Sequence, residues 1–386
     1  MKKIKDNPLM QIVILLAAIV GIILFLFVDS FVFAPKRITR RNETLADIRI
    51  PRQMDDVTIL FFSDLEYGTF LKEERLDSFV KTVNNASADI IIFGGDLYEN
   101  DAAVDEASVN TLKTALSSIK APLGKFAVYG DNDHKSDEAL ASVTDILESS
   151  GFEILNNRSV LLHNLDSQSV TLVGLDNGLN GNQDIAAAYS NVSPDSYVIT
   201  VCHTPDTAKK VPADLTDYFL SGHSHGGQVY YIFGATYTPA MATEYLRGKH
   251  NISDKFTLDI TNGVGTAIKD ERFLSYAEFA VYTLHSTAPL PTPSPSPTPE
   301  AQETADPAQS PEEQAEQPAE EAPAEEVPYE EPAEEIPEET VPEEPAEQEP
   351  EPVEEESAPA EEEAPAEPEQ SSEEEAPAET PEENNG

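Results

Sequence analysis

The stretch "GHSHGGQ" runs from Gly222 to Gln228 and places two imidazoles two positions apart between glycines. Histidine is the commonest metal ligand among side chains. Glycine lets the backbone approach a neighbour closely or adopt a positive φ. These seven residues therefore indicate either a metal-binding loop or an ordinary exposed turn, and the rest of the chain has to decide between them.

Polar residues of the ligand type follow apolar runs at five places in the chain. They are Asp64 and Glu66 in "SDLEYG", Asp96 in "GGDLY", Asp131 and Asp133 in "YGDND", His203 in "CHTPD", and His223 and His225 in "GHSHGG". An aspartate after a strand is often only a helix N-cap. Carboxylates and imidazoles gathered from five strand ends can instead bind a pair of divalent cations.

The apolar patterning predicts a sheet that brings these loops together. We expect strands at 57–64, 89–96 and 125–133, and helices from about 71 to 83, 104 to 119 and 137 to 149. Alternating strands and helices indicate parallel βαβ units, which place ligands at the carboxyl ends of their strands. After Gly151 the chain becomes rich in strands, with a meander predicted at 153–162 and 169–176 and another strand at 196–206.

The ordered set D-x-E, GGD, G-D-N-D, H and GHSH resembles the calcineurin-like metallophosphoesterases, and especially their membrane-associated bacterial branch with the GHTHGGQ signature. The resemblance covers about residues 48–285, including "LSGHSHGGQVY" and the closing "TNGVGTAIKDERFLSYAEFAVYTL". It implies an α/β (α+β) fold, a four-layer αββα sandwich of two mixed sheets flanked by helices. It also implies hydrolysis of a phosphomonoester or phosphodiester by attack of a metal-bridging hydroxide.

The resemblance assigns a role to each matching residue. Asp64 and His225 match the ligands of the first metal, Asp96 matches the bridging carboxylate, and His203 and His223 match the ligands of the second metal.

Two ligand positions depart from the family pattern. Glu66 stands where the family has histidine, and Asp131 stands where it has asparagine. Both can still bind metal, but the site now holds four carboxylates, whose charge balances two divalent cations. We therefore expect weaker attraction of phosphate and a preference for a harder cation, Mn²⁺, with Fe²⁺, Zn²⁺ and Mg²⁺ as alternatives.

Asn132 occupies the position of the family's catalytic histidine, and an amide cannot transfer a proton. His134 is a candidate replacement, while a one-residue shift of the loop would make Asn132 a ligand; the sequence leaves both open. The alternative function is a weakened pseudoenzyme that acts as an extracytoplasmic metal- or ligand-binding module. Arg247 and Arg272 are candidate substrate contacts, although a solvated surface arginine is the simpler interpretation of each.

The two ends of the chain differ in composition from the middle. We expect a basic N-terminus at 1–8, a single-pass transmembrane anchor at 9–34, the catalytic domain at 35–286 and a disordered acidic tail at 287–386. Residues 289–386 contain 35 acidic residues, 22 of the 30 prolines and no Lys or Arg.

These ends also bear on location and partners. Basic residues flank the span on both sides, Lys2, Lys3 and Lys5 before it and Lys36, Arg37, Arg40 and Arg41 after it, so their count leaves both orientations open. Because a short basic segment before the first span usually stays inside, we expect the domain outside the cytoplasm. The expected substrate is a phosphate ester that is linked to a lipid or to the cell envelope.

Without the tail the chain holds 37 acidic and 24 basic residues, so we expect no nucleic-acid partner. No sequence feature indicates an oligomeric state.

Overall fold

The computed structural model describes residues 7–289 apart from residues 101, 166 and 232. The predicted tail therefore lies outside the described residues from position 290 onward, as do the first six residues. Residues 287–289 carry no helix or strand.

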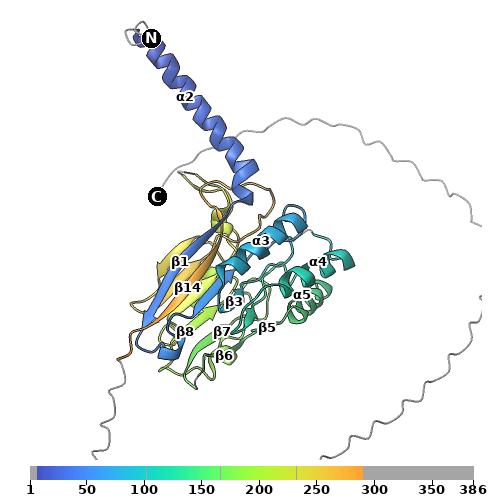
Figure 1. Ribbon diagram of the computed structural model, residues 1–386, viewed down its shortest axis with the longest axis vertical. Coiled ribbons are helices and arrows are strands. Elements are labelled where there is room, and N and C mark those ends of the chain that lie inside the picture. The colour runs from blue at the N-terminus through green and yellow to red at the C-terminus, as the bar shows by residue number, and fades with distance from the viewer. Residues whose placement is uncertain (1–6, 101, 166, 232, 290–386) are drawn as a thin grey trace, which may run out of the picture. The chain divides into compact units, whose positions relative to one another are not determined.

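Two mixed six-stranded sheets form the domain (Figure 1). The first has the order β1 (Ile38–Asp47), β14 (Ala277–Ser286), β2 (Thr58–Phe62), β3 (Ile90–Phe93), β4 (Lys125–Ala127), β5 (Phe152–Ile154). The second has the order β12 (Gly248–Asn251), β13 (Thr257–Ile260), β9 (Tyr218–Ser221), β8 (Val198–Val201), β7 (Ser169–Gly174), β6 (Arg158–His163). A short hairpin, β10 (Tyr230–Tyr231) with β11 (Gly234–Ala235), lies outside both sheets.

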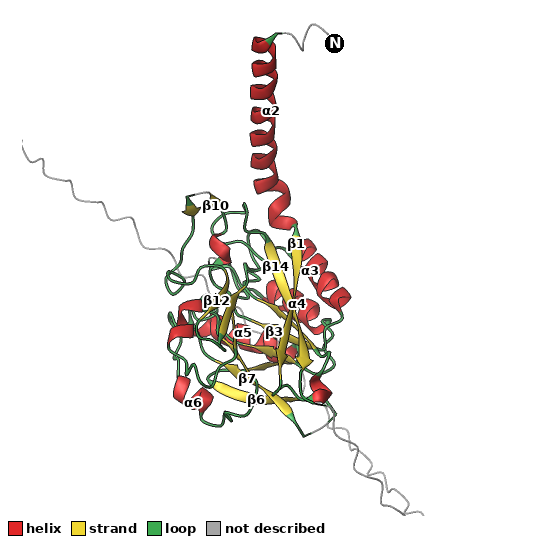
Figure 2. Cartoon of the chain, turned by 90° about the vertical axis from the view of Figure 1, so that its left-hand side faces the viewer, coloured by secondary structure: helices red, strands yellow, loops and turns green. Residues whose placement is uncertain are grey.

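Helices cover the outer face of each sheet, and three apolar cores separate the layers. Helices α3 (Glu73–Ala86), α4 (Glu106–Ser117) and α5 (Asp137–Ser149) share one core with the first sheet. A second core lies between the sheets, and a third joins α6 (Ile185–Tyr189) to the second sheet (Figure 2). The predicted four-layer αββα sandwich is confirmed.

Local sequence explains the elements next to the predicted ligands. Strand β3 has the sequence "IIIF" and is buried at every position, as expected of a central parallel strand. Leu76, Phe79, Val80 and Val83 form the buried stripe of α3, at helical spacing. The side chain of Ser136 caps α5 by accepting a hydrogen bond from the backbone N–H of Ala139, so the helix begins shortly after the GDND loop.

The strand-rich second half differs in one respect from the expected meander. Strand β5 pairs in parallel with β4 and closes the first sheet, whereas β6 and β7 form an antiparallel hairpin in the second. Strand β7 then pairs in parallel with β8. The chain thus crosses from one sheet to the other between Ile154 and Arg158.

The N-terminal helix α2 (Pro8–Val28) buries no side chain, and its mean hydropathy is 3.1 over the most apolar window. Asn7 caps it by accepting hydrogen bonds from the backbone N–H groups of Leu9 and Met10. The helical path continues through shorter turns to Lys36, two residues before β1 begins. This helix is long and apolar enough to cross a membrane, a property that anchors and signal sequences share.

A buried charge ties the two sheets together. The Asp259 carboxylate, fully buried on β13, accepts hydrogen bonds from Tyr218 on the same sheet and from Tyr282 on β14 of the other. Arg41, on β1, donates to the same carboxylate oxygen over 2.7 Å. Removing one partner of a buried ion pair leaves an uncompensated charge, which typically costs about 3–5 kcal/mol.

We therefore expect Arg41→Met to lower the free energy of unfolding of the full chain in detergent by about 3–5 kcal/mol, measured by urea titration. Arg40→Met is the matched control, because Arg40 is exposed and, among the described residues, its side chain donates a hydrogen bond to that of Asn42 alone. The control should change stability by less than about 0.5 kcal/mol. Equal losses in the two variants would contradict the proposed inter-sheet tie.

Candidate metal centre

The structure gathers the seven predicted ligand side chains into two adjoining groups. Within each group the potential ligand atoms lie within 4.8 Å of one another. The first group is Asp96, Asp131, His203 and His223, and the second is Asp64, Glu66 and His225. The groups meet at Asp64, whose Oδ1 atom lies 3.9 Å from His203 Nε2 and 3.8 Å from His225 Nε2. Such paired His/Asp groups are typical of dimetal phosphoesterases.

The parallel strands explain why these loops converge. Strands β2, β3 and β4 run in the same direction, and Asp64, Asp96 and Asp131 all follow their carboxyl ends. Strands β8 and β9 are likewise parallel and lead into His203 and His223.

The loop backbones are unusual at the ligands themselves. Five of the seven residues adopt a left-handed conformation with φ between 50° and 68°, namely Asp64, Glu66, Asp96, His223 and His225. Non-glycine residues seldom take such φ values, and clusters of them are associated with functional sites.

The glycines of "GHSHGGQ" serve close packing. A Cβ atom on Gly222 would lie 2.1 Å from Ser63 Oγ, and one on Gly226, whose φ is +60°, would lie 2.0 Å from Asn262 Oδ1. Glycine therefore allows the histidine loop to pack directly against the loops that follow β2 and β13. The stretch is a buried loop of the site and not an exposed turn.

Hydrogen bonds to carbonyl groups orient two of the imidazoles. His203 Nδ1 lies 2.7 Å from the Gly94 carbonyl oxygen, and His223 Nε2 lies 2.7 Å from the Ala240 carbonyl oxygen. Since a carbonyl only accepts, each of these nitrogens carries the proton, and the opposite nitrogen faces the carboxylates. Fixing the tautomer in this way is the usual function of the outer partners of a metal-binding histidine.

Burying four ionised carboxylates costs free energy unless bound cations compensate their charge. Desolvation raises the pKa of Asp96 to about 7 and raises that of Glu66 well above its usual range, with nearby carboxylates adding to the shift at Glu66. At Asp131 burial acts in the same direction, but the adjacent His203 and His223 imidazoles outweigh it and hold the pKa far below its usual value.

Two buried polar atoms without hydrogen-bond partners are also consistent with bound cations. Within the described residues, the buried Asp131 Oδ1 and His203 Nε2 atoms have no hydrogen-bond partner of acceptable geometry, although 3.2 Å separates them. Unpartnered oxygen and imidazole nitrogen atoms beside other carboxylates are the donor set of a divalent cation. The residues present therefore fit two metal ions.

The GDND loop gives its three polar residues different surroundings. The Asp133 carboxylate accepts hydrogen bonds from the backbone N–H groups of Asp96, Leu97 and Gly130, and so holds the loops together. The Asn132 amide donates to Glu66 Oε1 over 3.2 Å. Since Asp131 lies beside His203 and His223, the geometry disfavours the one-residue shift that would make Asn132 a ligand.

His134 points to a different neighbour. Its Nε2 atom lies 2.8 Å from Asp176 Oδ1, and this hydrogen bond raises the pKa of His134. A cavity lies next to the two groups of ligands. Asn132 is one of the described residues that line this cavity, and His134 is not.

That cavity has a volume of about 360 Å³. Besides ligand residues and Asn132 it is lined by Glu99, Asn100, Tyr237, Ala267 and Ile268. Tyr237 has no counterpart among the sequence predictions. Burial, followed by the charges of Asp131 and Glu66, raises the pKa of its phenol, so the hydroxyl stays protonated near the metal groups.

The two predicted arginine contacts lie outside the described lining of this cavity. Arg272 is fully buried, and its guanidinium donates to backbone carbonyl groups that include Asn262 and Ser275. It therefore holds the segment 262–275 in place. The Arg247 guanidinium stacks on the Tyr230 ring at 4.6 Å.

The two ligand groups predict a metal content. We expect the Mn²⁺-loaded full chain to retain about two ions after desalting, as measured by elemental analysis, because each group offers at least three ligands. His225→Ala should retain about one ion, whereas His163→Ala, at an exposed position on β6, should retain two. One ion or none in the wild type, or equal loss in both variants, would rule out this assignment.

Comparisons with known proteins agree with this site. A model of the calcineurin-like phosphoesterase family matches residues 57–227. The uncharacterized metallophosphoesterase YkuE of Bacillus subtilis is 30% identical over 255 residues, which cover 66% of this chain and 87% of the relative. A transmembrane protein with metallophosphoesterase domain from Bos taurus is 25% identical over 230 residues, which cover 56% of this chain and 50% of the relative. UDP-2,3-diacylglucosamine pyrophosphatase LpxG of Chlamydia muridarum is 27% identical over 235 residues, which cover 48% of this chain and 69% of the relative. This chain belongs to the calcineurin-like phosphoesterase family.

Proposed function

We propose that the chain is a membrane-anchored phosphoesterase that uses two divalent cations to hydrolyse a phosphomonoester or phosphodiester. The observation that carries this proposal is the convergence of four carboxylates and three imidazoles in two adjoining groups, five of whose seven side chains line one cavity. Two bound cations would polarise a phosphoryl group and activate a water molecule at neutral pH.

The side chains around the cavity have separate tasks. Asp64, Glu66 and His225 would hold one ion, and Asp131, His203 and His223 would hold the other. We assign to Asp96, which belongs to the second group, the bridging position that the family resemblance implies. The Asn132 amide and the Tyr237 hydroxyl, both in the cavity lining, are the hydrogen-bond donors that we assign to the phosphoryl oxygens or to the leaving group.

The charge of the site restricts the metals and the substrate. Four ionised carboxylates balance two divalent cations, so the loaded site attracts an anionic phosphate less than a site with fewer carboxylates would. The oxygen-rich donor set favours Mn²⁺ over Zn²⁺.

The identity of residue 132 restricts the reaction further. Because the Asn132 amide cannot give up a proton, we expect the fastest turnover for substrates whose leaving group needs no protonation. The same residue favours a second candidate function, a binding module that keeps the metals and lacks turnover.

We propose that helix α2 anchors the protein in a membrane, with the catalytic domain on the extracytoplasmic side. Support comes from helix α2 and from the transmembrane relative. Another relative, whose name describes a pyrophosphatase of UDP-2,3-diacylglucosamine, supports a lipid-linked phosphate ester as the substrate.

An assay of the full chain in detergent separates the two candidate functions. We expect hydrolysis of 4-nitrophenyl phosphate or bis(4-nitrophenyl) phosphate that is greatest with Mn²⁺ among Mn²⁺, Fe²⁺, Zn²⁺ and Mg²⁺. Asp96→Asn should lower kcat by at least about 10²-fold, because it removes the carboxylate to which we assign contacts with both ions. Asp214→Asn, at an exposed position away from the cavity, should leave kcat unchanged.

Two results would count against the enzyme. Metal binding without turnover of either substrate would favour the binding module. Turnover that survives Asp96→Asn would come from a contaminant or from another site, and would refute the proposed one.

A further inference from the structure

The metal cavity and the end of the apolar helix lie at the same end of the domain. Strand β1 begins at Ile38, directly after the helical segment that ends at Lys36. Strand β14 runs parallel to β1, and β2 runs antiparallel to β14. The carboxyl ends of β2, β3 and β4 therefore lie at the end where β1 begins (Figure 2).

Exposed apolar side chains collect at this end. Outside the N-terminal helical segment, nine large hydrophobic side chains of the described residues are exposed. Five of them belong to the β10–β11 hairpin and to the loop between β13 and β14 at this end, and we call these five the apolar rim: Tyr231, Phe233, Ile268, Leu274 and Tyr276. Phe233 is 100% exposed and Ile268 is 70% exposed. Exposed apolar groups gathered in this way mark an interaction site, whereas single ones are ordinary.

The apolar rim is continuous with the helix. A groove of about 550 Å³ is lined on one side by helix residues such as Leu26 and Phe27, and on the other by Tyr231, Phe233 and Leu274 of the rim. The backbone N–H of Arg272 donates to the Ser30 carbonyl oxygen over 3.0 Å, which fastens the rim loop to the helical segment.

The apolar rim also reaches the metal cavity. Ile268 lines that cavity while most of its surface remains exposed. Gln228, the last residue of "GHSHGGQ", fixes this loop with its side-chain amide, which donates to the Ala267 and Lys269 carbonyl oxygens and accepts from the Ala267 N–H. One loop thus forms both a wall of the cavity and part of the exposed apolar surface.

We propose that the apolar rim rests on the bilayer that holds α2, so that the metal cavity opens toward the lipid headgroups. The substrate is then a phosphorylated amphiphile whose hydrocarbon chains stay in the membrane while its phosphate enters the cavity. The identity of the substrate rests on the proposed phosphoesterase function, whereas the docking of the rim does not.

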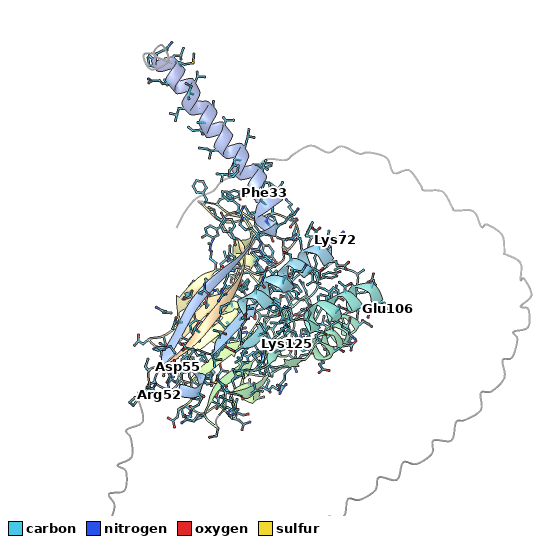
Figure 3. The ribbon with its side chains drawn as sticks, viewed as in Figure 1. Phe33, Arg52, Asp55, Lys72, Glu106 and Lys125 are labelled. Carbon is cyan, nitrogen blue, oxygen red and sulfur yellow. The ribbon has the colours of Figure 1, made fainter. Side chains whose placement is uncertain are left out.

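Charge supports a lipid surface as the occupant. Lys36, the last residue of the helical segment, and Lys269, in the rim loop between Ile268 and Leu274, are both exposed. Lys72, also exposed, lies near the base of α2 together with Phe33 (Figure 3). Basic side chains beside an apolar surface complement anionic headgroups near the membrane.

Docking can be measured without any activity because the chain contains no tryptophan. The Phe233→Trp variant of the full chain carries one fluorophore on the rim. The Leu165→Trp control carries it at a position that is 99% exposed, between β6 and β7. Since β7 runs parallel to β8, whose carboxyl end leads to His203, this control position lies at the opposite end of the domain.

Both variants are reconstituted into vesicles of phosphatidylcholine and phosphatidylglycerol with brominated acyl chains. We expect bromine to quench the Phe233→Trp fluorescence at least about threefold more strongly than that of Leu165→Trp, with a blue-shifted emission maximum only in the former. Equal quenching and equal emission maxima would overturn the docking proposal.

The substrate class is tested with two probes that share a headgroup. We expect wild-type kcat/KM for phosphatidic acid in vesicles to exceed that for soluble glycerol 3-phosphate at least tenfold. The double variant Phe233→Ser/Leu274→Ser should remove most of that preference and leave the rate on glycerol 3-phosphate unchanged. Equal values for both probes in the wild type would overturn the amphiphile assignment. No turnover of either probe, with quenching as expected, would refute a phosphomonoesterase that acts on an amphiphile and retain the docking.

Discussion

The constraint on which the site depends is the burial of four carboxylates within a few ångströms of one another. Asp64, Glu66 and Asp96 are almost wholly inaccessible to solvent, and Asp131 lies beside them. Ionised groups in such surroundings need compensating positive charge, since desolvation and mutual repulsion both oppose ionisation. Three imidazoles provide part of the compensation, and two divalent cations would complete it.

The fold brings these charged side chains together because the strands that precede them run in the same direction. Each ligand loop follows a strand of a parallel set, so side chains that are distant in sequence meet at one edge of the sandwich. The left-handed residues and the glycines let the loops pack closely enough to bring the ligands within a metal's reach. The sheets that carry these loops are tied together by the buried Asp259 carboxylate, which accepts hydrogen bonds from both of them.

Much of this arrangement could be predicted from the sequence. The apolar runs before Asp64 and Asp96 have the length and composition of buried strands, and polar ligands directly after them indicate a shared edge. The allocation of strands to sheets could not be predicted, because β5 and β6 have similar local patterns and only tertiary pairing separates them. Tyr237 carries no local signal either, since a tyrosine in a loop reaches the cavity only through the path of the chain. The burial of Arg272 depends in the same way on carbonyl groups contributed by distant loops.

The central claim is that the two ligand groups hold two ions in one cavity, and anomalous diffraction from crystals of the Mn²⁺-loaded full chain tests it most directly. The account predicts two manganese peaks about 3.5–4 Å apart, the usual spacing of two-metal sites. One peak should lie among Asp96, Asp131, His203 and His223, and the other among Asp64, Glu66 and His225. A single peak in this cavity, or two peaks elsewhere on the chain, would contradict the account.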